Sequence, residues 1–351
     1  MKQLKNSKVL VTGGAGFIGS NLIEHFLGNK NEVICLDNLS TGHRKNIVQF
    51  LDDPNFQMIE GDIRDLDTCK TAARDCEYIF HGAALGSVPR SIIDPVVTNA
   101  VNIDGFLNML TAARDEGVKR FIYAASSSTY GDSKELPKIE ERIGRPLSPY
   151  GITKIVNEYF AKVYSEIYGL ETIGLRYFNV FGKRQDPNGA YAAVIPIWVK
   201  RLMEHESPVI NGDGSYSRDF TYIANVVHAN EIAATVSSVE ILKNLKSYYT
   251  LLKDSVNIDI EPSAIVMDIF NVAFGGRTTL LQLFGTLRDQ LAQYDPKIGE
   301  IEVSTAPARV GDIAHSLASI DKAKLVLGYA PQYDASQGFE AACKWYYESL
   351  K

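Results

Sequence analysis

The 351-residue sequence contains no apolar run long enough to cross a membrane, and residues 1–6 are polar and lead directly into a predicted strand. We therefore expect neither a membrane-spanning helix nor a secretory leader. The chain also lacks an excess of basic residues, because 36 Lys and Arg stand against 42 Asp and Glu, for a net charge of −6. This balance disfavours nucleic acid as a partner, since a phosphate backbone requires a basic surface.

Cysteine is scarce, and the four cysteines (Cys35, Cys69, Cys76 and Cys343) show no metal-ligand spacing with histidine. The sequence therefore predicts no metal site, and we interpret the cysteines as reduced thiols of a cytoplasmic protein. Internal repeats and low-complexity linkers are missing too. A composition of 45% hydrophobic and 22% charged residues is ordinary for a globular chain with one large domain or two closely joined ones.

Short apolar runs alternate with amphipathic stretches through the first half of the chain. The apolar runs predict strands at residues 8–12, 32–37, 57–60, 78–81, 120–124 and 171–175. Helical patterns lie between them, as at residues 19–26, 99–116 and 150–168. This alternation predicts an α/β fold with a doubly wound parallel sheet of the Rossmann type.

The alternation of predicted strands and helices becomes irregular from about Phe181, where the sequence has many Gly, Pro, Asn and Tyr residues. Such segments often cover the open end of a sheet and carry ligand contacts. We expect a smaller C-terminal α/β region there that binds substrate. Residues 237–267 are long and mixed in character, and we interpret them as a surface insertion without a chemical role.

A glycine-rich run, GGAGFIG at residues 13–19, follows the first predicted strand and opens a helix. Glycines let the backbone turn tightly and approach a pyrophosphate, which the helix N-terminus then holds. Asp37 ends the next strand, where a carboxylate would bind the adenosine ribose hydroxyls and repel a 2′-phosphate. The sequence therefore predicts a dinucleotide site that prefers NAD to NADP.

Tyr150 and Lys154 are four residues apart at the start of a predicted helix, just after Pro149. This spacing places both side chains on one helix face, where a nearby ammonium favours the phenolate that a tyrosine base needs. The serines at 126–128 follow the fifth strand, at the carboxyl end of the sheet. A hydroxyl there could bind the reacting oxygen and relay its proton, although position alone does not choose among the three.

Several further motifs complete a pattern: LDNLSTG at 36–42, GDI at 61–63, HGAA at 81–84, RYFNVFG at 176–182, SRDF at 217–220 and RVGD at 309–312. With the glycine run and the Tyr-Lys pair, they resemble the extended short-chain dehydrogenase/reductases, and in detail the UDP-hexose 4-epimerases, over nearly the whole chain. ALGSVPRS at 84–91 and GAYAAVIP at 189–196 are most similar to bacterial UDP-N-acetylglucosamine 4-epimerases.

The resemblance implies an isomerase that acts on a UDP-sugar with bound NAD, in which Ser126, Tyr150 and Lys154 are catalytic. It implies an NAD-binding domain at residues 1–178 and a region at 179–351 that mainly binds nucleotide sugar, with some segments returning to the first domain. A homodimer is usual in such proteins. The residues expected to contact NAD are Gly13, Gly16, Phe17, Ile18, Gly19, Asp37, Asn38, Ser40, Thr41, Gly42, Asp62, Ile63, Gly82, Ala83, Val101, Tyr150, Lys154 and Val180. Those expected to contact the UDP-sugar are Gly86, Ser87, Ser126, Ser127, Tyr150, Asn179, Ala193, Val194, Asn211, Arg218, Arg277, Arg309, Asp312 and Ser316.

The choice of sugar rests on Ser316, seven residues beyond Arg309. A bulky tyrosine at the corresponding position of the family crowds the C2 substituent, whereas serine leaves room for an acetamido group. We therefore expect conversion of UDP-GlcNAc to UDP-GalNAc. The sequence departs from these relatives at Ile197 and Val209, where they carry Lys and Tyr.

Alternative functions remain open at this point. The chain could epimerise UDP-glucose, UDP-galactose or a uronic acid form, or act as a nucleotide-sugar 4,6-dehydratase. A dehydratase needs an acid and a base to remove water, and such relatives place Asp-Glu after the serine or threonine near the fifth strand, where this chain has SST at 127–129. A non-catalytic NAD-sensing regulator is disfavoured because Tyr150 and Lys154 are both present.

Overall fold

The computed structural model describes residues 3–189, 192–256, 260–261, 263–307 and 314–350. A seven-stranded sheet with the order β11-β6-β5-β4-β1-β2-β3 forms its centre, and every neighbouring pair is parallel. The strands are β1 (Lys8–Thr12), β2 (Glu32–Asp37), β3 (Phe56–Glu60), β4 (Tyr78–His81), β5 (Arg120–Ser126), β6 (Glu171–Tyr177) and β11 (Met267–Val272). This order confirms the predicted Rossmann-type sheet, whose direction of winding reverses between β1 and β4.

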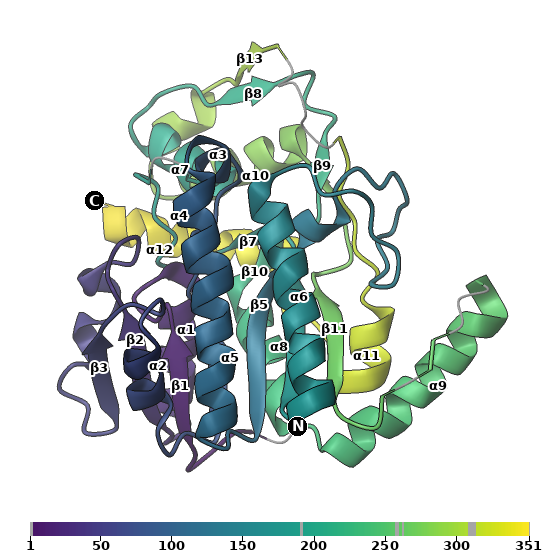
Figure 1. Cartoon of the computed structure of the whole chain (residues 1–351). Coiled ribbons are helices and arrows are strands. Elements are labelled where there is room, and N and C mark those ends of the chain that lie inside the picture. Colours follow the sequence, from purple (N-terminus) through teal and green to yellow (C-terminus); the bar gives the residue numbers. More distant parts are fainter. Residues whose placement is uncertain (1–2, 190–191, 257–259, 262, 308–313, 351) are drawn as a thin grey trace.

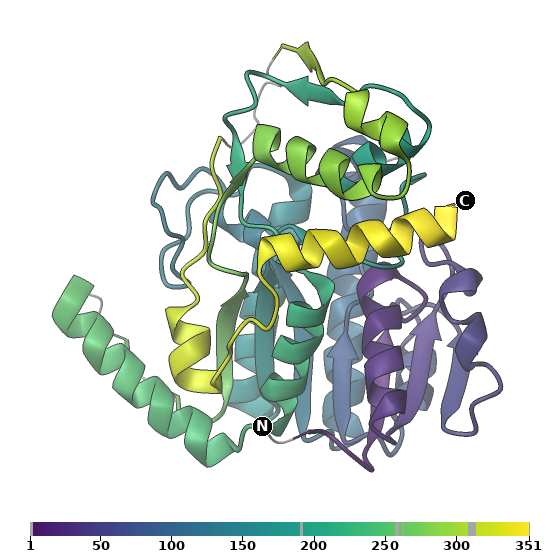
Figure 2. The ribbon, with the colours of Figure 1, turned by 180° about the vertical axis from the view of Figure 1, so that it is seen from behind.

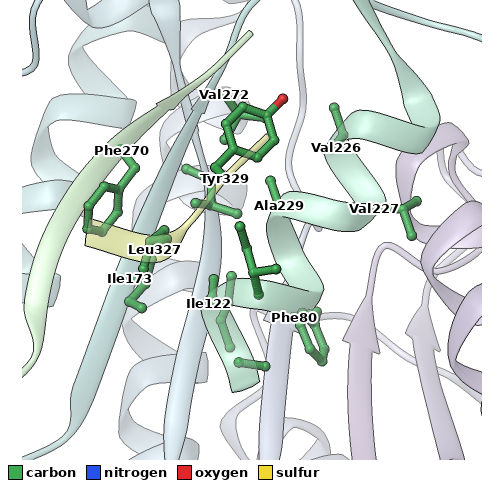
Figure 3. Packing of buried hydrophobic residues seen from close by; sticks show 14 of the residues in the cluster. Phe80, Ile122, Ile173, Val226, Val227, Ala229, Phe270, Val272, Leu327 and Tyr329 are labelled. Carbon is green, nitrogen blue, oxygen red and sulfur yellow. The ribbon is translucent and has the colours of Figure 1, made fainter. Parts of the chain in front are cut away.

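Helices cover both faces of the sheet, which buries the nearly continuous apolar strands (Figure 1 and Figure 2). One face carries α2 (Leu66–Ala73), α5 (Gly105–Asp115) and α6 (Pro149–Tyr168), with the short α3 (Val88–Ile93) and α4 (Pro95–Asn99) beside α6. The other carries α1 (Phe17–Gly28), α8 (Ile223–Thr235) and α11 (Asp321–Leu327). In Figure 3, Val226 and Ala229 of α8 belong to one apolar cluster with Ile122 and Ile173 of the central strands.

The predicted helix at residues 99–116 is longer and less regular than expected. Helix α4 runs through a π-helical turn at Ala100–Asp104 directly into α5, so the three segments form one column in Figure 1. Helix α6 begins at Pro149 because Ser148 caps it, accepting a hydrogen bond from the Gly151 N–H. It ends at Gly169, whose φ of 73° few other residues adopt.

The second half is more ordered than its irregular sequence suggests. Three further helices, α7 (Val194–Met203), α10 (Leu280–Ala292) and α12 (Ala335–Leu350), bury a separate apolar cluster near one end of the sheet. Three two-stranded sheets join them: β7 (Val180–Phe181) with β10 (Thr221–Tyr222), β9 (Ser217–Arg218) with β12 (Thr278–Thr279), and β8 (Val209–Asn211) with β13 (Ser304–Ala306).

The segment interpreted as a surface insertion is largely a 19-residue helix, α9 (Ser238–Val256), followed by β11, which begins at Met267. Its inner side is buried against α11, and the Lys322 ammonium binds the Glu141 and Asp268 carboxylates at 2.8 and 2.6 Å beneath it. This part of the chain is therefore mostly helical, and it leads into the edge strand of the main sheet. Among the described residues, we find no helix with the length and apolar character of a membrane span.

Candidate active site

The glycine run forms a tight turn between β1 and α1, in which Gly13 and Gly19 leave no room for a Cβ. Gly13 has a φ of +69°, and a Cβ placed on it would lie 2.8 Å from the Ala83 nitrogen. A Cβ on Gly19 would lie 2.2 Å from the Gly13 oxygen. Gly16 caps α1 without any side-chain hydrogen bond, so the helix begins with bare backbone at the end of a strand. Such a helix end is suited to holding a phosphate.

A pocket of about 330 Å³ opens beside this turn, where the strand order reverses. Backbone and small side chains at the carboxyl ends of neighbouring strands line it. Its predicted lining residues are Gly13, Gly16, Phe17, Ile18, Gly19, Asp37, Asn38, Ser40, Thr41, Gly42, Asp62, Ile63, Gly82, Ala83 and Val101. Gly86, which the resemblance assigns to the substrate, lines it as well. The pocket therefore brings together most of the residues expected to contact NAD.

Asp37 is 8% exposed and contributes to this pocket. Its carboxylate accepts hydrogen bonds from the Ala15 N–H at 2.9 Å and the Leu39 N–H at 2.8 Å. Burial raises its pKa, and the two N–H groups oppose that rise. The side chain thus braces the glycine turn, a role that sequence reasoning did not foresee, while its oxygens keep lone pairs for a ribose hydroxyl.

Ser126, Tyr150 and Lys154 meet where β5 faces α6. The Lys154 ammonium donates to the Ala124 carbonyl at 2.7 Å and lies 5.9 Å from the centre of the Tyr150 ring. Burial lowers the pKa of Lys154 to about 8, and the Glu158 carboxylate opposes this change. Because Ala124 also lines the pocket, the lysine lies directly behind the dinucleotide site.

Burial raises the pKa of Tyr150, and a hydrogen bond with Ser126 lowers it. The Lys154 ammonium is directed to a backbone carbonyl, and its expected support of the phenolate stays a prediction. The Ser126 hydroxyl donates its one proton to the Ser128 oxygen at 3.0 Å. Of the three serines, Ser126 is the one whose hydrogen bonding lowers the Tyr150 pKa.

Sequence reasoning did not assign His81 or Asn230, both of which line the first pocket. The His81 Nδ1 lies 2.8 Å from the Thr12 Oγ1, and burial lowers the His81 pKa to about 3, helped by the Lys154 charge. The position of His81, at the end of β4 in the HGAA motif, was a usable signal. Asn230 lies within α8, far along the chain, and gave none.

A second pocket of about 330 Å³ lies between β7, β9 and α7. Its predicted lining residues are Asn179, Val180, Ala193, Val194, Asn211 and Arg218. Val180, assigned to the cofactor by the resemblance, belongs to this group. Tyr216 and Leu280 line it too and were missed, although Tyr216 stands two residues before Arg218, a spacing that puts strand side chains on one side.

Among the described residues, four further predicted contacts line neither pocket: Ser87, Ser127, Arg277 and Ser316. Ser87 caps α3 by accepting from the Arg90 N–H at 3.1 Å, and Ser127 opens a short 3-10 helix. Arg277 is exposed just before β12. The Ser316 N–H donates to the Ser217 carbonyl at 3.0 Å, which places Ser316 beside the strand of Arg218. Arg309 and Asp312 lie outside the described residues.

The first pocket fits a dinucleotide. The glycine turn leaves space that side chains would fill, the N-terminus of α1 suits a pyrophosphate, and Asp37 stands where a ribose would lie. Phe17, Ile18 and Asn38 would contact the bound group from its edges.

Comparison with known proteins gives consistent results. Residues 9–241 match the NAD dependent epimerase/dehydratase family. A putative UDP-glucose 4-epimerase of Methanocaldococcus jannaschii is 33% identical over 339 residues, 96% of this chain and 97% of that protein. Among solved structures, the UDP-N-acetylglucosamine 4-epimerase of Methanobrevibacter ruminantium M1, in complex with UDP-N-acetylmuramic acid, is 35% identical with a TM-score of 0.82, covering 98% of this chain and 99% of that one. The UDP-glucose 4-epimerase of Thermotoga maritima, with UDP-glucose, is 33% identical with a TM-score of 0.83, covering 98% and 100%.

Proposed function

Because the chain belongs to the NAD dependent epimerase/dehydratase family and is of the UDP-sugar 4-epimerase type, we propose that it reversibly inverts C4 of a UDP-N-acetylhexosamine, converting UDP-GlcNAc to UDP-GalNAc. The observation that carries the proposal is the Ser126–Tyr150–Lys154 group behind the dinucleotide pocket. These residues provide an acid–base group for a sugar hydroxyl next to a hydride acceptor.

In this mechanism the Tyr150 oxygen takes the proton of the C4 hydroxyl. Ser126 forms a hydrogen bond with the Tyr150 oxygen. Bound NAD would accept the C4 hydride and return it, and the positive charge of its oxidised ring would favour the Tyr150 phenolate. Lys154, with a pKa lowered to about 8, supplies an additional positive charge near the phenol. Tyr150 then returns the proton after the sugar has turned its other face.

The second pocket supports the binding of the UDP part. Arg218 lines it with the amide of Asn211, and a guanidinium forms forked hydrogen bonds to phosphate. Binding energy from this remote part would retain the sugar while it reorients. Residues 127–129, which follow the catalytic serine, carry no carboxylate, which supports epimerisation over dehydration.

The N-acetylated sugar is proposed from Ser316, whose small side chain lies beside the strand of Arg218. The relatives named above include enzymes named for UDP-glucose and for UDP-N-acetylglucosamine, so their likeness alone does not choose the sugar. Preference for the larger sugar would come from polar groups left unpaired without an acetamido group, with Ser87 and Asn179 as candidates.

The test is incubation of the purified protein with UDP-GlcNAc, UDP-GalNAc, UDP-glucose and UDP-galactose, followed by separation of products and measurement of kcat/KM for each. We expect the highest values for the two N-acetylated sugars. A higher value for UDP-glucose would contradict the choice of sugar. Release of a dehydrated product would contradict epimerisation, and binding of NAD without turnover or transient absorbance in the NADH band would indicate a sensor.

We also propose a cytoplasmic homodimer. Apolar side chains are exposed along one side of α6 and on the adjoining α3 and α4: Ile152, Tyr159, Val163, Ile167, Ile92, Ile93 and Val96. Such a contiguous apolar face is typical of an interface between subunits. Light scattering after size-exclusion chromatography would give the mass of the assembly. The four buried free cysteines are compatible with a reducing cytoplasm.

A further inference from the structure

Asp219 lies between the phosphate-binding candidate Arg218 and the core residue Phe220, and it is completely buried. Backbone N–H groups hold its carboxylate. Gly275 donates to both carboxylate oxygens at 3.2 Å, and Ala318 donates to one of them at 3.2 Å. Two segments far apart in sequence are therefore fastened to one side chain.

Both segments lead to residues expected to contact the UDP-sugar. Gly275 has a φ of +85° and stands two residues before Arg277. Ala318 stands two residues after Ser316, whose own N–H donates to the neighbouring Ser217 carbonyl.

Asp219 also reaches the second pocket through its backbone. Its carbonyl accepts from the Asn179 side-chain amide at 3.1 Å, and Asn179, with a φ of 37°, lines that pocket. The same residue thus joins three separate parts of the proposed substrate site.

Burial of the charged Asp219 carboxylate costs free energy, because the group loses its hydration. Burial raises the Asp219 pKa to about 6, and the N–H groups of Ala318 and residues 274–276 only partly oppose this. An apolar side chain would avoid this cost but could not accept hydrogen bonds from two loops. The placement therefore favours a role in fixing the loops over a contribution to stability.

We propose that Asp219 is a positioning residue for the nucleotide sugar, whose carboxylate fastens the Gly275 turn and the Ala318 segment beside Arg218 and Asn179 of the second pocket. This rests on the proposed function, because it assumes that the pocket binds UDP. Asp219 does not itself touch the substrate, and the cofactor pocket is built from other segments.

The test compares Asp219→Asn with Asp213→Asn. Asparagine is of nearly the same size but offers one acceptor oxygen and turns an amide N–H toward the donors. Asp213 is an exposed residue of the preceding connection, between β8 and β9, and its carboxylate accepts only from Ser215 in the described hydrogen bonds. For each protein, kcat, KM, the Kd of UDP by calorimetry, the bound NAD and the melting temperature are measured.

For Asp219→Asn we expect KM and the Kd of UDP to rise by about tenfold or more, with kcat changed by less than about threefold and NAD retained, because loop placement affects binding before chemistry. Asp213→Asn should match the wild type. Unchanged KM and Kd in Asp219→Asn, or equal losses of kcat, NAD and substrate binding, would overturn the proposal.

If Asp219→Asn does not fold, Gly275→Ala tests the same turn with the carboxylate retained, because alanine is strained at a φ of +85°. It should raise KM and the Kd of UDP with NAD retained, and normal values would overturn the proposal. A wild type that binds UDP but converts no UDP-sugar would contradict the proposed function alone, since the UDP affinities of the variants still test the role of Asp219.

Discussion

The two pockets of this protein are assembled differently. The first takes most of its lining from the residues that directly follow β1, β2, β3 and β4, so each contact is set by a strand end and the turn after it. The second collects residues from β7, the start of α7, β8, β9 and the start of α10, which meet only through pairings between distant segments.

The two pockets also differ in whether backbone or side chains would contact the ligand. In the first pocket the decisive features are glycines and backbone, because a Cβ at Gly13 or Gly19 would overlap neighbouring main chain. In the second pocket they are side chains such as Asn211, Tyr216 and Arg218, held by short strands. Changes of backbone shape should therefore remove the cofactor, and changes of side chain should alter substrate choice.

Gly19→Ala should give the broadest effect, on cofactor binding and activity together, because the new Cβ would lie 2.2 Å from the Gly13 oxygen and must displace the turn. We expect NAD occupancy to fall by about tenfold or more, with activity lost in proportion. The measurement is NAD released from denatured, purified protein. Gly28→Ala is the matched control in the same helix, since a Cβ there meets nothing within 4 Å. Retention of NAD by Gly19→Ala would contradict the view that backbone shape determines cofactor binding in the first pocket.

Tyr150→Phe should reduce the rate of the chemical step without changing ligand binding in either pocket, because only the phenolic oxygen is lost. We expect kcat to fall by about a thousandfold, within the range that a lost acid–base group gives, while bound NAD and the Kd of UDP stay unchanged. Tyr168→Phe, an exposed tyrosine in the last turn of the same helix, is the control. More than a tenth of wild-type turnover in Tyr150→Phe would exclude this residue as the base.

The same contrast explains what the sequence could predict. The glycine turn, Asp37 and the Tyr150–Lys154 pair were found because strand, turn and helix lie consecutively in the chain, and Ser148 and Pro149 mark the start of α6 locally. Asn230 and Leu280 could not be found, since nothing nearby in sequence indicates which pocket they reach. The edge strand β11 was missed because it pairs with β6, whose residues lie 95 positions earlier in the chain.

Asp37→Ser should give an intermediate effect on cofactor choice. Without the carboxylate a 2′-phosphate is no longer repelled, so we expect the preference for NAD over NADP to fall by about tenfold to a hundredfold. Because Asp37 also accepts from the Ala15 and Leu39 N–H groups, the affinity for NAD itself should weaken. Binding of both cofactors is measured by fluorescence, with the exposed Asp52→Ser as control. Equal wild-type affinities for NAD and NADP would contradict the assignment.

Ser316→Tyr should give the smallest overall change and the sharpest test of the second pocket. Ser316 is half-buried next to β9, and a phenol there would occupy space that an acetamido group at C2 needs. We expect kcat/KM for UDP-GlcNAc to fall by about tenfold relative to UDP-glucose, while NAD binding, built from distant backbone, stays unchanged. Ser247→Tyr, on the exposed side of α9, controls for the added bulk. Because steric exclusion should act on the larger sugar alone, an equal loss for both sugars would mean that tyrosine distorts β9. An unchanged ratio would mean that Ser316 does not face the sugar, and the selection of the N-acetylated substrate would then have to come from other residues of the second pocket.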